Sequence, residues 1–349
     1  MEEITIKDIA KKCGVGVSTV SRAINNHPNI NPDTRAHILK VIQETGYVPN
    51  NSARNLKRTD AKCIAVLMKG VANPLFAEAV AVIEEVLKEE KYALVLQHVE
   101  AYENELDVAF ELIKEKRLRG IIFLGGAFYH DREELARLNV PFVFYTIIGE
   151  EEKGKGKGKG KGYSYSCVSV DDRAESRKMT EYLLELGHKR IAFLTEGAQA
   201  GSVGQLRLEG YKDALRHRGI EVDEKLICEV QRNEDPYSMQ NGYNTTKQLL
   251  QSKAEFTALF AIADFLAVGA CRALHEAGLR IPEDVSVAGF DGIPLGAFYV
   301  PQLTTISQPV ERMARQTVRL LLDVIDGEAE HEHVIFPASL TIRESTRAI

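Results

Sequence analysis

The sequence lacks the features of membrane, secreted and metal-cluster proteins. No segment approaches the roughly 18 consecutive apolar residues that a membrane-spanning helix needs, and the first residues carry neither a basic nor an apolar secretory region. The five cysteines are scattered, and no two form a C-x-x-C pair of the kind that zinc sites use. They are Cys13, Cys63, Cys167, Cys228 and Cys271. We therefore expect a cytoplasmic protein with reduced thiols and no bound metal.

Motifs of common enzyme classes are also missing. No G-x-G-x-x-G, P-loop or G-x-S-x-G motif follows an expected strand, and no histidine and carboxylate pattern suggests catalysis. His188 and His275 fall at expected helix ends, where a structural role is the simpler interpretation. The sequence therefore predicts neither an enzyme nor a cofactor.

Positive charge is scarce overall but concentrated at the N-terminus. The 349 residues, too many for one ordinary domain, carry a net charge of −6. Residues 1–60 hold nine lysines and arginines against six acidic residues, whereas the remainder holds 35 against 44. A small basic head can meet a phosphate backbone, while the acidic body cannot coat nucleic acid nonspecifically.

Two short helices joined by a tight turn are predicted at the N-terminus. Thr5 is a suitable N-cap, and Asp8 favours the positive end of the helix. Residues 13–16 contain two glycines and end this helix, and residues 17–24 predict a second one. This arrangement indicates a helix-turn-helix unit.

The second helix predicts an exposed face that suits a DNA groove. Its buried face would hold Val20, Ala23 and Ile24, and its exposed face Val17, Ser18, Ser21 and Arg22. Small side chains let a helix lie deep in the major groove, and an arginine there can make a bidentate contact to guanine. A small helical hairpin without DNA binding is the alternative interpretation of these residues alone.

A third helix has clear start and stop signals. Asn31 is a good N-cap, Pro32 fits the first helical position, and Asp33 lies in the first turn. Gly46 ends the helix, and Pro49 prevents its continuation. The head is therefore expected to be all-α.

From Cys63 onward, apolar segments alternate with helical patterns. Strands are expected over 64–68, 92–97, 121–124, 142–145, 190–194, 258–262 and 285–289, with helices over 75–90, 103–116 and 132–138 among others. Continuous apolar strands separated by helices predict an α/β body with parallel, doubly wound sheets. Two such lobes fit the length. A ligand cleft is expected beyond the carboxyl ends of the strands.

Residues 153–162 form an alternating Lys-Gly repeat that follows Glu150, Glu151 and Glu152. Such a segment cannot bury a core, so the sequence predicts a mobile, solvated loop. The two interpretations are a tolerated surface insertion and a contact with DNA or an acidic partner.

Segments in both halves of the chain resemble one family of bacterial regulators. In the head these are Thr5–Ala10, Gly14–Val15, Ser18–Arg22, Asn25, Gly46–Asn50 and Ala53–Lys57. In the body they are Asn73–Glu78, Leu186–Ile191, Arg207–Tyr211, Gly289–Asp291 and Pro301–Ile306. The chain thus resembles the lac and gal repressor (LacI/GalR) family over nearly its whole length. The resemblance implies a DNA-binding transcriptional repressor with a helix-turn-helix head and a body like a periplasmic binding protein.

The resemblance also assigns roles in the head. Val17, Ser18 and Arg22 match positions that read base edges, and Thr5, Thr19, Ser21 and Asn25 match positions that contact phosphates or orient the helix. Asn50, Ala53, Leu56 and Lys57 match a hinge helix that folds on DNA in the minor groove.

Two further positions of the head, Leu56 and Gly16, bear on the contacts with DNA. Leu56 matches a leucine wedge that unstacks a central base step and kinks the duplex; an ordinary core leucine is the alternative. Gly16 stands where the family usually has serine, so a hydroxyl contact to a phosphate is lost there.

The resemblance implies a domain organisation. The head would cover 1–49, the hinge helix and linker 50–60, and the effector-binding and dimerisation domain 61–349. Lobe 1 would comprise about 61–168 and 292–326, and lobe 2 about 169–291 and 334–349. The chain would cross between the lobes after about residue 168, near 291, and within 327–337.

The effector positions implied by the resemblance follow expected strands. They are Lys69, Asn73, Phe76, Thr146, Arg207, Tyr237, Asp264 and Asp291. Arg207 can hold ligand oxygens as a fork, Asp291 can accept from sugar hydroxyls, and Phe76 and Tyr237 can cover a ring. Each of them can equally be structural, and Asp264 in particular fits a cap for the helix that follows it.

Two of these positions depart from the sugar-binding members. Lys69 stands where the family usually has a neutral or acidic residue, and Thr146 where an aspartate is frequent. Both changes make the cleft more positive, which gives the hypothesis of an anionic effector such as a sugar phosphate or sugar acid. The alternative is that Lys69 pairs with a nearby carboxylate or points to solvent.

The sequence therefore predicts a homodimer that binds a near-palindromic double-stranded operator under the control of a small carbohydrate-related effector. The sequence shows no terminal heptad pattern that would predict a coiled-coil tetramer. The alternatives are an enzyme, a solute-binding transport protein, and a regulator with a phosphorylated carrier protein as corepressor.

Overall fold

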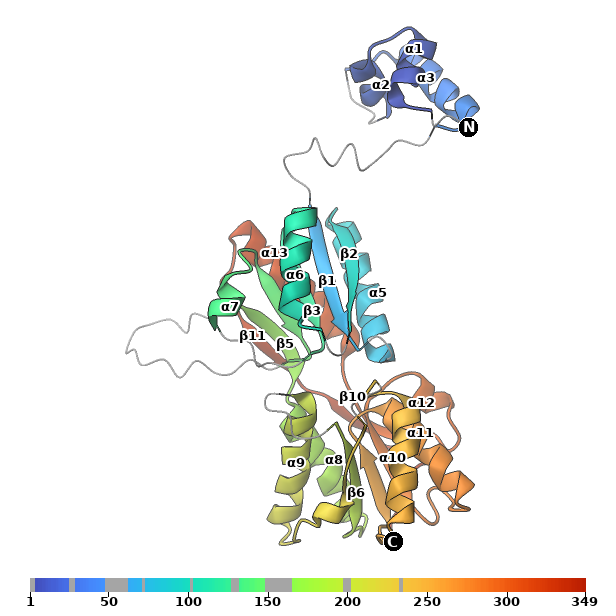
Figure 1. Cartoon of the computed structure of the whole chain (residues 1–349), viewed down its shortest axis with the longest axis vertical. Helices are drawn as coiled ribbons and strands as arrows, with labels where there is room; N and C mark the ends of the chain where they lie inside the picture. Colours follow the sequence, from blue (N-terminus) through green and yellow to red (C-terminus); the bar gives the residue numbers. More distant parts are fainter. Residues whose placement is uncertain are drawn as a thin grey trace, which may run out of the picture. The chain divides into compact units, whose positions relative to one another are not determined.

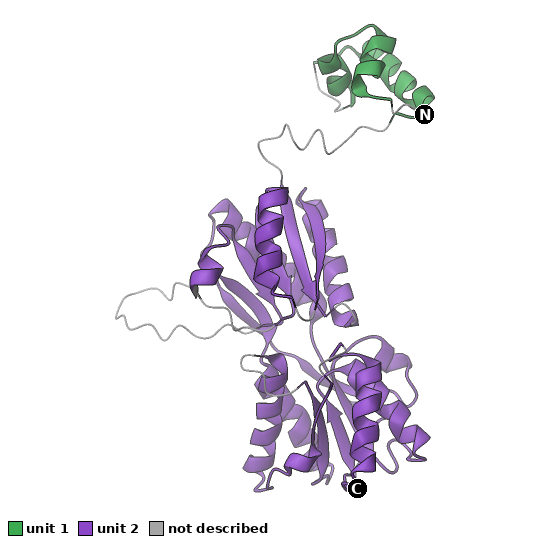
Figure 2. Ribbon diagram, in the orientation of Figure 1, with its two compact units in different colours: residues 1–61 green, residues 62–349 purple. Residues whose placement is uncertain are grey.

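The computed structural model describes residues 4–24, 29–47, 62–70, 73–100, 103–126, 132–147, 165–196, 202–231 and 235–349. The chain divides into two units, residues 1–61 and residues 62–349 (Figure 2). The expected hinge helix over 50–60 and the Lys-Gly repeat over 153–162 lie outside the described residues. In the described part of the chain, no helix has the length and apolarity to span a bilayer.

The described residues of the first unit form three helices: α1 (Ile6–Cys13), α2 (Val17–Ile24) and α3 (Pro32–Thr45) (Figure 1). Gly14 ends α1 with a left-handed backbone, φ 66°, and the Asn31 side chain caps the start of α3. These elements and caps confirm the predicted helical head. Its core consists of Ile9, Ala10, Val20, Ala23 and Ile38.

The first lobe of the second unit is built on a parallel sheet with the strand order β11-β5-β4-β3-β1-β2. The strands are β1 (Cys63–Lys69), β2 (Ala93–Val99), β3 (Gly120–Leu124), β4 (Phe142–Tyr145), β5 (Ser166–Val170) and β11 (His333–Phe336). The helices are α5 (Pro74–Glu89), α6 (Glu105–Lys116), α7 (Arg132–Ala136) and α13 (Val310–Asp326). Apolar residues of α5 and α13 pack on one face of the sheet and those of α6 on the other, as the doubly wound pattern predicted.

The second lobe repeats this plan with the strand order β12-β10-β9-β8-β6-β7. The strands are β6 (Ile191–Thr195), β7 (Ile227–Glu229), β8 (Ala258–Ala261), β9 (Ser286–Asp291), β10 (Thr304–Ser307) and β12 (Ser339–Thr341). The helices are α8 (Asp172–Glu185), α9 (Val203–His217), α10 (Met239–Gln251), α11 (Asp264–Glu276), the short α12 (Leu295–Phe298) and a single 3₁₀ turn, η1 (Glu224–Leu226). The pairing of β10 with β12 is antiparallel, and the other pairings are parallel.

The division between the lobes differs from the expected one. Strand β10 pairs with β9, so residues 292–307 stay with the second lobe and the second crossing lies at 308–309 rather than near 291. Strand β11 pairs with β5 and completes the first sheet, which moves residues 334–336 from the second lobe to the first. The expectation was wrong there because short strands of three or four residues do not reveal in sequence which sheet they join.

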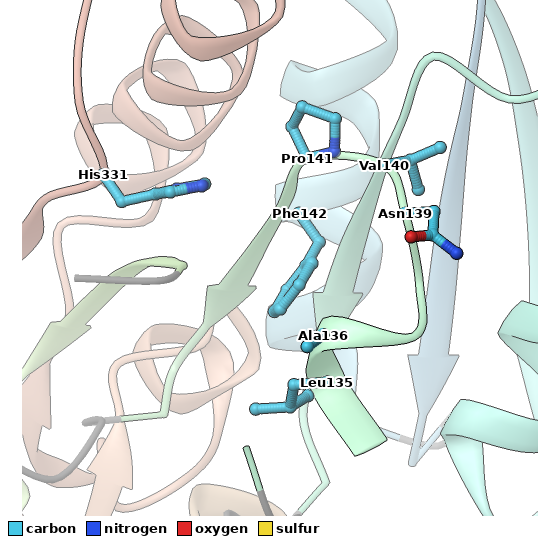
Figure 3. A pocket seen from close by; sticks show the side chains of 7 residues that line it. All are labelled: Leu135, Ala136, Asn139, Val140, Pro141, Phe142 and His331. Carbon is cyan, nitrogen blue, oxygen red and sulfur yellow. The ribbon is translucent and has the colours of Figure 1, made fainter. Parts of the chain in front are cut away.

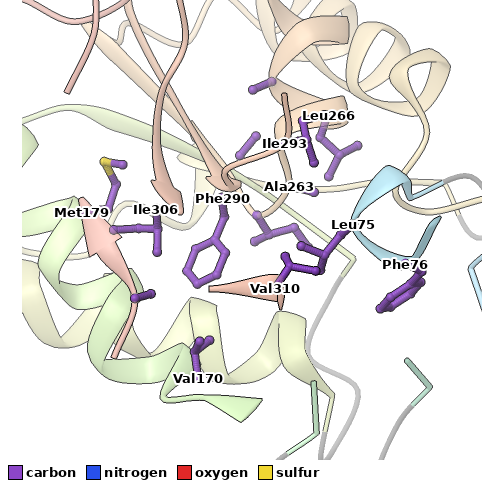
Figure 4. Packing of buried hydrophobic residues seen from close by; sticks show 14 of the residues in the cluster. Leu75, Phe76, Val170, Met179, Ala263, Leu266, Phe290, Ile293, Ile306 and Val310 are labelled. Atoms are coloured by element: carbon purple, nitrogen blue, oxygen red, sulfur yellow. The ribbon is translucent and has the colours of Figure 1, made fainter. Parts of the chain in front are cut away.

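One hydrophobic cluster runs through both lobes. It includes Leu75 and Phe76 of α5, Val310 of α13, and Phe290 and Ile306 of the second sheet (Figure 4). Because these residues come from both sides of the crossing segments, the strand ends of the two sheets are held close together.

Candidate functional site

The exposed surface of α2 carries the residues predicted to read bases. Ser18 and Arg22 are exposed, and Val17 leaves 41% of its area accessible. An exposed apolar side chain beside a cation suits contact with a thymine methyl group and a neighbouring guanine. Thr19 and Ser21 are half-buried on the flanks of this face.

The other predicted DNA contacts are placed only in part. Asn25, Asn50, Ala53, Leu56 and Lys57 lie outside the described residues, so their roles stay predictions. At Gly16 an added Cβ would make only an ordinary contact, 3.6 Å from Ser18 Oγ.

Thr5 begins α1 through a reciprocal interaction with Asp8. Its backbone N–H and its hydroxyl both donate to Asp8 Oδ2, at 2.9 and 2.6 Å. These hydrogen bonds lower the pKa of Asp8. The hydroxyl of Thr5 is therefore oriented by Asp8.

In the second unit, a hydrogen bond joins the lobes where strand ends meet. Asn73 follows β1 and caps α5, with its Oδ1 accepting from the N–H of Leu75 at 3.0 Å. Its Nδ2 donates to Oδ2 of Asp291, the last residue of β9, at 3.3 Å. The two residues are 9% and 3% exposed, so this link is shielded from water. The structure thus brings together two residues predicted for the effector site from opposite lobes.

Asp291 is the centre of this cluster. Its Oδ1 accepts from Gln308 Nε2 at 3.0 Å and lies 3.6 Å from the Arg207 guanidinium. Burial raises the pKa of Asp291 to about 6, although Arg207 and the hydrogen bonds from Asn73 and Gln308 oppose the rise. Its φ of 115° is a conformation that only glycine adopts easily. Backbone strain of this kind gathers at functional sites.

Arg207 is buried on α9 and fully engaged. Its guanidinium donates to Asp172 Oδ1 at 2.8 Å and to the carbonyl of Ile262, and lies 3.6 Å from the centre of the Phe290 ring. Burial alone would lower the pKa of Arg207, but Asp172 and Asp291 raise it. The cation is therefore permanent and already neutralised by its own lobe.

Asp264 serves the loop after β9 rather than its own helix. Its Oδ2 accepts from the N–H groups of Gly292 and Ile293, each at 2.9 Å, and its Oδ1 accepts from the Thr305 hydroxyl at 2.6 Å. Burial, helped by the charge of Asp291, raises the pKa of Asp264 to about 8. These contacts orient the segment that carries Asp291, which makes Asp264 a positioning residue.

Lys69 does not offer a free charge. Its Nζ donates to the Glu105 carboxylate at 3.0 Å and to the Glu103 carbonyl at 2.8 Å, and both side chains of the ion pair are largely buried. The structure thus favours the alternative in which Lys69 pairs with a nearby carboxylate. Thr146 is buried, has a positive φ of 69°, and donates its N–H to the Val168 carbonyl at 2.8 Å.

The two predicted aromatic residues differ in their surroundings. Phe76 is buried with its ring against Gly125, where a Cβ would lie 2.8 Å from the ring. Tyr237 is half-buried, and burial together with the neighbouring Glu196 raises the pKa of its phenol well above the usual value. Tyr237 therefore stays neutral and donates to Glu196.

Sequence reasoning missed Tyr145, the last residue of β4. Its side chain is fully buried, and its hydroxyl has no hydrogen-bond partner among the described residues. A polar residue at the carboxyl end of a parallel strand can indicate a binding site. Because the rest of β4 is apolar, however, the sequence suggests that Tyr145 is a core residue.

Two cavities lie away from this cluster. One, of about 260 Å³, is bordered by Pro141, Phe142 and His331 at the start of β4 (Figure 3). The other, of about 310 Å³, lies between α10 and α11. Within the described residues no group of three or more side chains that could hold a metal ion occurs. The polar cluster in which Asn73 of one lobe meets Asp291 of the other is the candidate binding site.

Known proteins share this combination of units. Residues 5–50 match the family described as bacterial regulatory proteins, lacI family, and residues 180–346 match a periplasmic binding protein-like domain. The HTH-type transcriptional regulator MalR of Clostridium butyricum is 38% identical over 345 residues, which cover 98% of this chain and 99% of that protein.

Solved structures agree over the whole length. A lac repressor dimer bound to operator and the anti-inducer ONPF has a TM-score of 0.77 at 27% identity, covering 99% of this chain and 100% of that one. A complex of the transcriptional regulator CelR with cellobiose has a TM-score of 0.69 at 30% identity, covering 98% and 99%. With a relative of this identity and coverage, the chain belongs to the lacI family of bacterial regulatory proteins.

Proposed function

We propose that this protein is a homodimeric transcriptional repressor whose affinity for a near-palindromic operator is set by a neutral carbohydrate bound between its lobes. The observation that carries the proposal is the buried hydrogen bond between Asn73 and Asp291. It makes the closure of the lobes depend on the same carboxylate that a ligand hydroxyl would engage. A ligand that competes for Asp291 shifts the equilibrium between the open and closed arrangements of the lobes. Ligand affinity and operator affinity are then coupled, so each changes the other by the same factor.

In the head, α2 is the proposed recognition helix, with Arg22 as its principal base contact. The proposed DNA-contacting residues are Thr5, Val17, Ser18, Thr19, Ser21, Arg22, Asn25, Asn50, Ala53, Leu56 and Lys57. Two heads of a dimer would lie in successive major grooves, about 34 Å apart, which requires an operator with two-fold symmetry.

The proposal of a neutral effector rests on the charges around Asp291. Arg207 is balanced by Asp172 and Asp291, and Lys69 by Glu105. An incoming phosphate or carboxylate would meet no unpaired cation among these groups and would approach two buried aspartates. A sugar hydroxyl, in contrast, can donate to Asp291 without bringing charge. The cellobiose complex of the CelR relative is consistent with this class.

The test combines operator binding with a ligand panel. An operator is first selected from random duplexes, and its affinity is then measured by fluorescence anisotropy with cellobiose, maltose, ribose, glucose 6-phosphate and gluconate. We expect a neutral sugar to change operator affinity and the two anions to have no effect. Failure to select any symmetric duplex would contradict the repressor. A response confined to the anions would contradict the neutral effector, and the Lys69→Met variant would then lose that response.

The proposed dimer uses an apolar surface of the second lobe. Phe298 and Val300 expose 84% and 86% of their area, and Leu295 exposes 39%. Adjacent exposed apolar side chains of this size usually belong to an interface. A second copy is the proposed occupant, as in the lac repressor dimer that this chain resembles. Sedimentation velocity should give a dimer for the wild type and a monomer for Phe298→Asp; an unchanged dimer would place the interface elsewhere.

A further inference from the structure

The hydroxyl of Tyr145 is one of a few buried polar groups without a partner among the described residues, and it belongs to one of the largest side chains that are fully buried. It is completely buried, yet no described residue accepts its proton or donates to it. A buried polar group left in this state costs stability comparable to a lost hydrogen bond, and native proteins rarely keep one without a purpose. The phenol could be replaced by a phenylalanine ring without loss to the core of the protein alone.

Tyr211 is a buried tyrosine with a structural role and serves as the comparison for Tyr145. It is 1% exposed in the second lobe, and its hydroxyl donates to the Ile191 carbonyl at 2.8 Å. Tyr145 belongs to the same hydrophobic cluster and is equally buried. The difference between them is therefore the missing partner, and burial does not explain it.

Tyr145 lies at the carboxyl edge of the first sheet, the edge from which Asn73 reaches Asp291 of the second lobe. It ends β4, and the backbone turns immediately afterwards through Thr146 with its positive φ. Burial first, and then the carboxylates of Glu78 and Asp291, raise the pKa of the Tyr145 phenol. The phenol thus remains a neutral donor within electrostatic range of the carboxylate that joins the lobes.

We propose that the Tyr145 hydroxyl is a specificity-determining contact, donating a hydrogen bond to a hydroxyl oxygen of the carbohydrate effector. A sugar hydroxyl is both acceptor and donor, so it can accept from Tyr145 while its own hydrogen is directed to Asp291. A ligand group that can only donate, such as an ammonium, cannot satisfy the phenol in this way. This inference rests on the proposed function, since it names one further residue of the same site.

The experiment compares Tyr145→Phe with Tyr211→Phe in the full-length protein. Isothermal titration calorimetry with cellobiose, maltose and ribose gives affinities, and thermal unfolding without sugar gives Tm. For Tyr145→Phe we expect affinity for the bound sugar to fall on the order of 10-fold, with Tm unchanged or higher. For Tyr211→Phe we expect Tm to fall by about 2 °C, with affinity unchanged.

A second measurement identifies the hydroxyl. Monodeoxy derivatives of the sugar that binds are titrated against the wild type and Tyr145→Phe. One derivative should bind the wild type more weakly than the parent sugar but bind the variant as well as the parent does, as a double-mutant cycle requires for a direct contact.

The outcomes separate this inference from the function on which it rests. If the wild type binds a sugar and Tyr145→Phe binds it with the same affinity, the proposed role of Tyr145 is wrong, while the carbohydrate effector still stands. A drop in Tm for Tyr145→Phe as large as that for Tyr211→Phe would make the hydroxyl structural. Wild-type protein that binds none of the sugars would overturn the carbohydrate effector and this contact together.

Discussion

The two units present functional chemistry in opposite ways. In the head, Ser18 and Arg22 stand on the outside of a small three-helix core and are accessible before any partner arrives. In the body, Asn73, Arg207 and Asp291 are buried and already bonded to one another or to neighbouring groups. DNA is a large ligand that binds at a surface, whereas a small effector at the proposed site would have to replace contacts that the protein makes with itself.

This contrast has an energetic consequence. Exposed charges in the head are solvated and contribute little to folding. Buried charges in the body are costly unless they stay paired, and Asp291 of the proposed effector site also accepts the hydrogen bond from Asn73 that links the lobes. Substitutions in the two units should therefore affect different measurements.

The largest expected effect is on stability, from Arg207→Met. The variant removes the cation shared by Asp172 and Asp291 and leaves two buried carboxylates without it. Loss of one partner of a buried pair costs roughly 3–5 kcal/mol. Urea unfolding of the isolated body, residues 62–349, should show this loss, with Arg173→Met as the matched surface control because its partner Asp213 lies at the periphery. If both variants were equally stable, the claim that buried ion pairs stabilise the body more than exposed ones would be contradicted.

The next effect is on operator binding, from Arg22→Ala. A bidentate arginine contact contributes about 1–3 kcal/mol of discrimination, so operator affinity should fall roughly 10- to 100-fold while the unfolding curve stays unchanged. Anisotropy titrations with the selected operator measure the first quantity, and circular dichroism melting the second. Lys40→Ala on α3 is the control, since its exposed pair with Glu44 is local. A loss of stability in place of affinity would assign Arg22 a structural role.

The smallest effect is a dependence of stability on pH. Because burial raises the pKa of Asp291 to about 6 in the folded protein, the folded state binds a proton that the unfolded state releases. This contribution is complete below the unfolded pKa of about 4 and is lost as the pH rises through 6. Asp291 should thus make the wild type about 1 kcal/mol more stable at pH 5 than at pH 7.

Asp291→Asn isolates this contribution. Other carboxyls titrate in both proteins, so the quantity to compare is the difference between wild type and variant at each pH, measured by urea unfolding. That difference should change by about 1 kcal/mol between pH 5 and pH 7. A constant difference across this range would mean that Asp291 is ionised throughout.

The head could be predicted from the sequence almost residue by residue. Its helix boundaries depend on neighbours within four positions: the Asn31 cap, the Gly14 turn, and the spacing of Val20 and Ala23. In the body, the alternation of strands and helices could also be predicted, because buried parallel strands are continuous apolar segments of the sequence. Local propensity and periodicity were sufficient for the head and for seven strands of the body, but they did not predict β5, β7, β10 and β11.

The candidate effector site was predictable only as a set of positions. The sequence placed Lys69, Asp264 and Asp291 after strands, but it did not indicate their partners. Glu105 pairs with Lys69, the loop after β9 donates to Asp264, and Asn73 donates to Asp291. Each of these partners is remote in the chain. The second crossing was misplaced for the same reason, since only the pairing of β10 with β9 assigns it.

By itself, the sequence determined the three helices of the described head, the longer strands and helices of the body, and the basic head on an acidic body, because these depend on local spacing and composition. The tertiary structure alone decided which charges are paired, which sheet the short strands join, and that the Tyr145 hydroxyl has no partner among the described residues. Hydrogen bonds and ion pairs inside a protein join residues far apart in the chain. Their pattern exists only once the chain has folded.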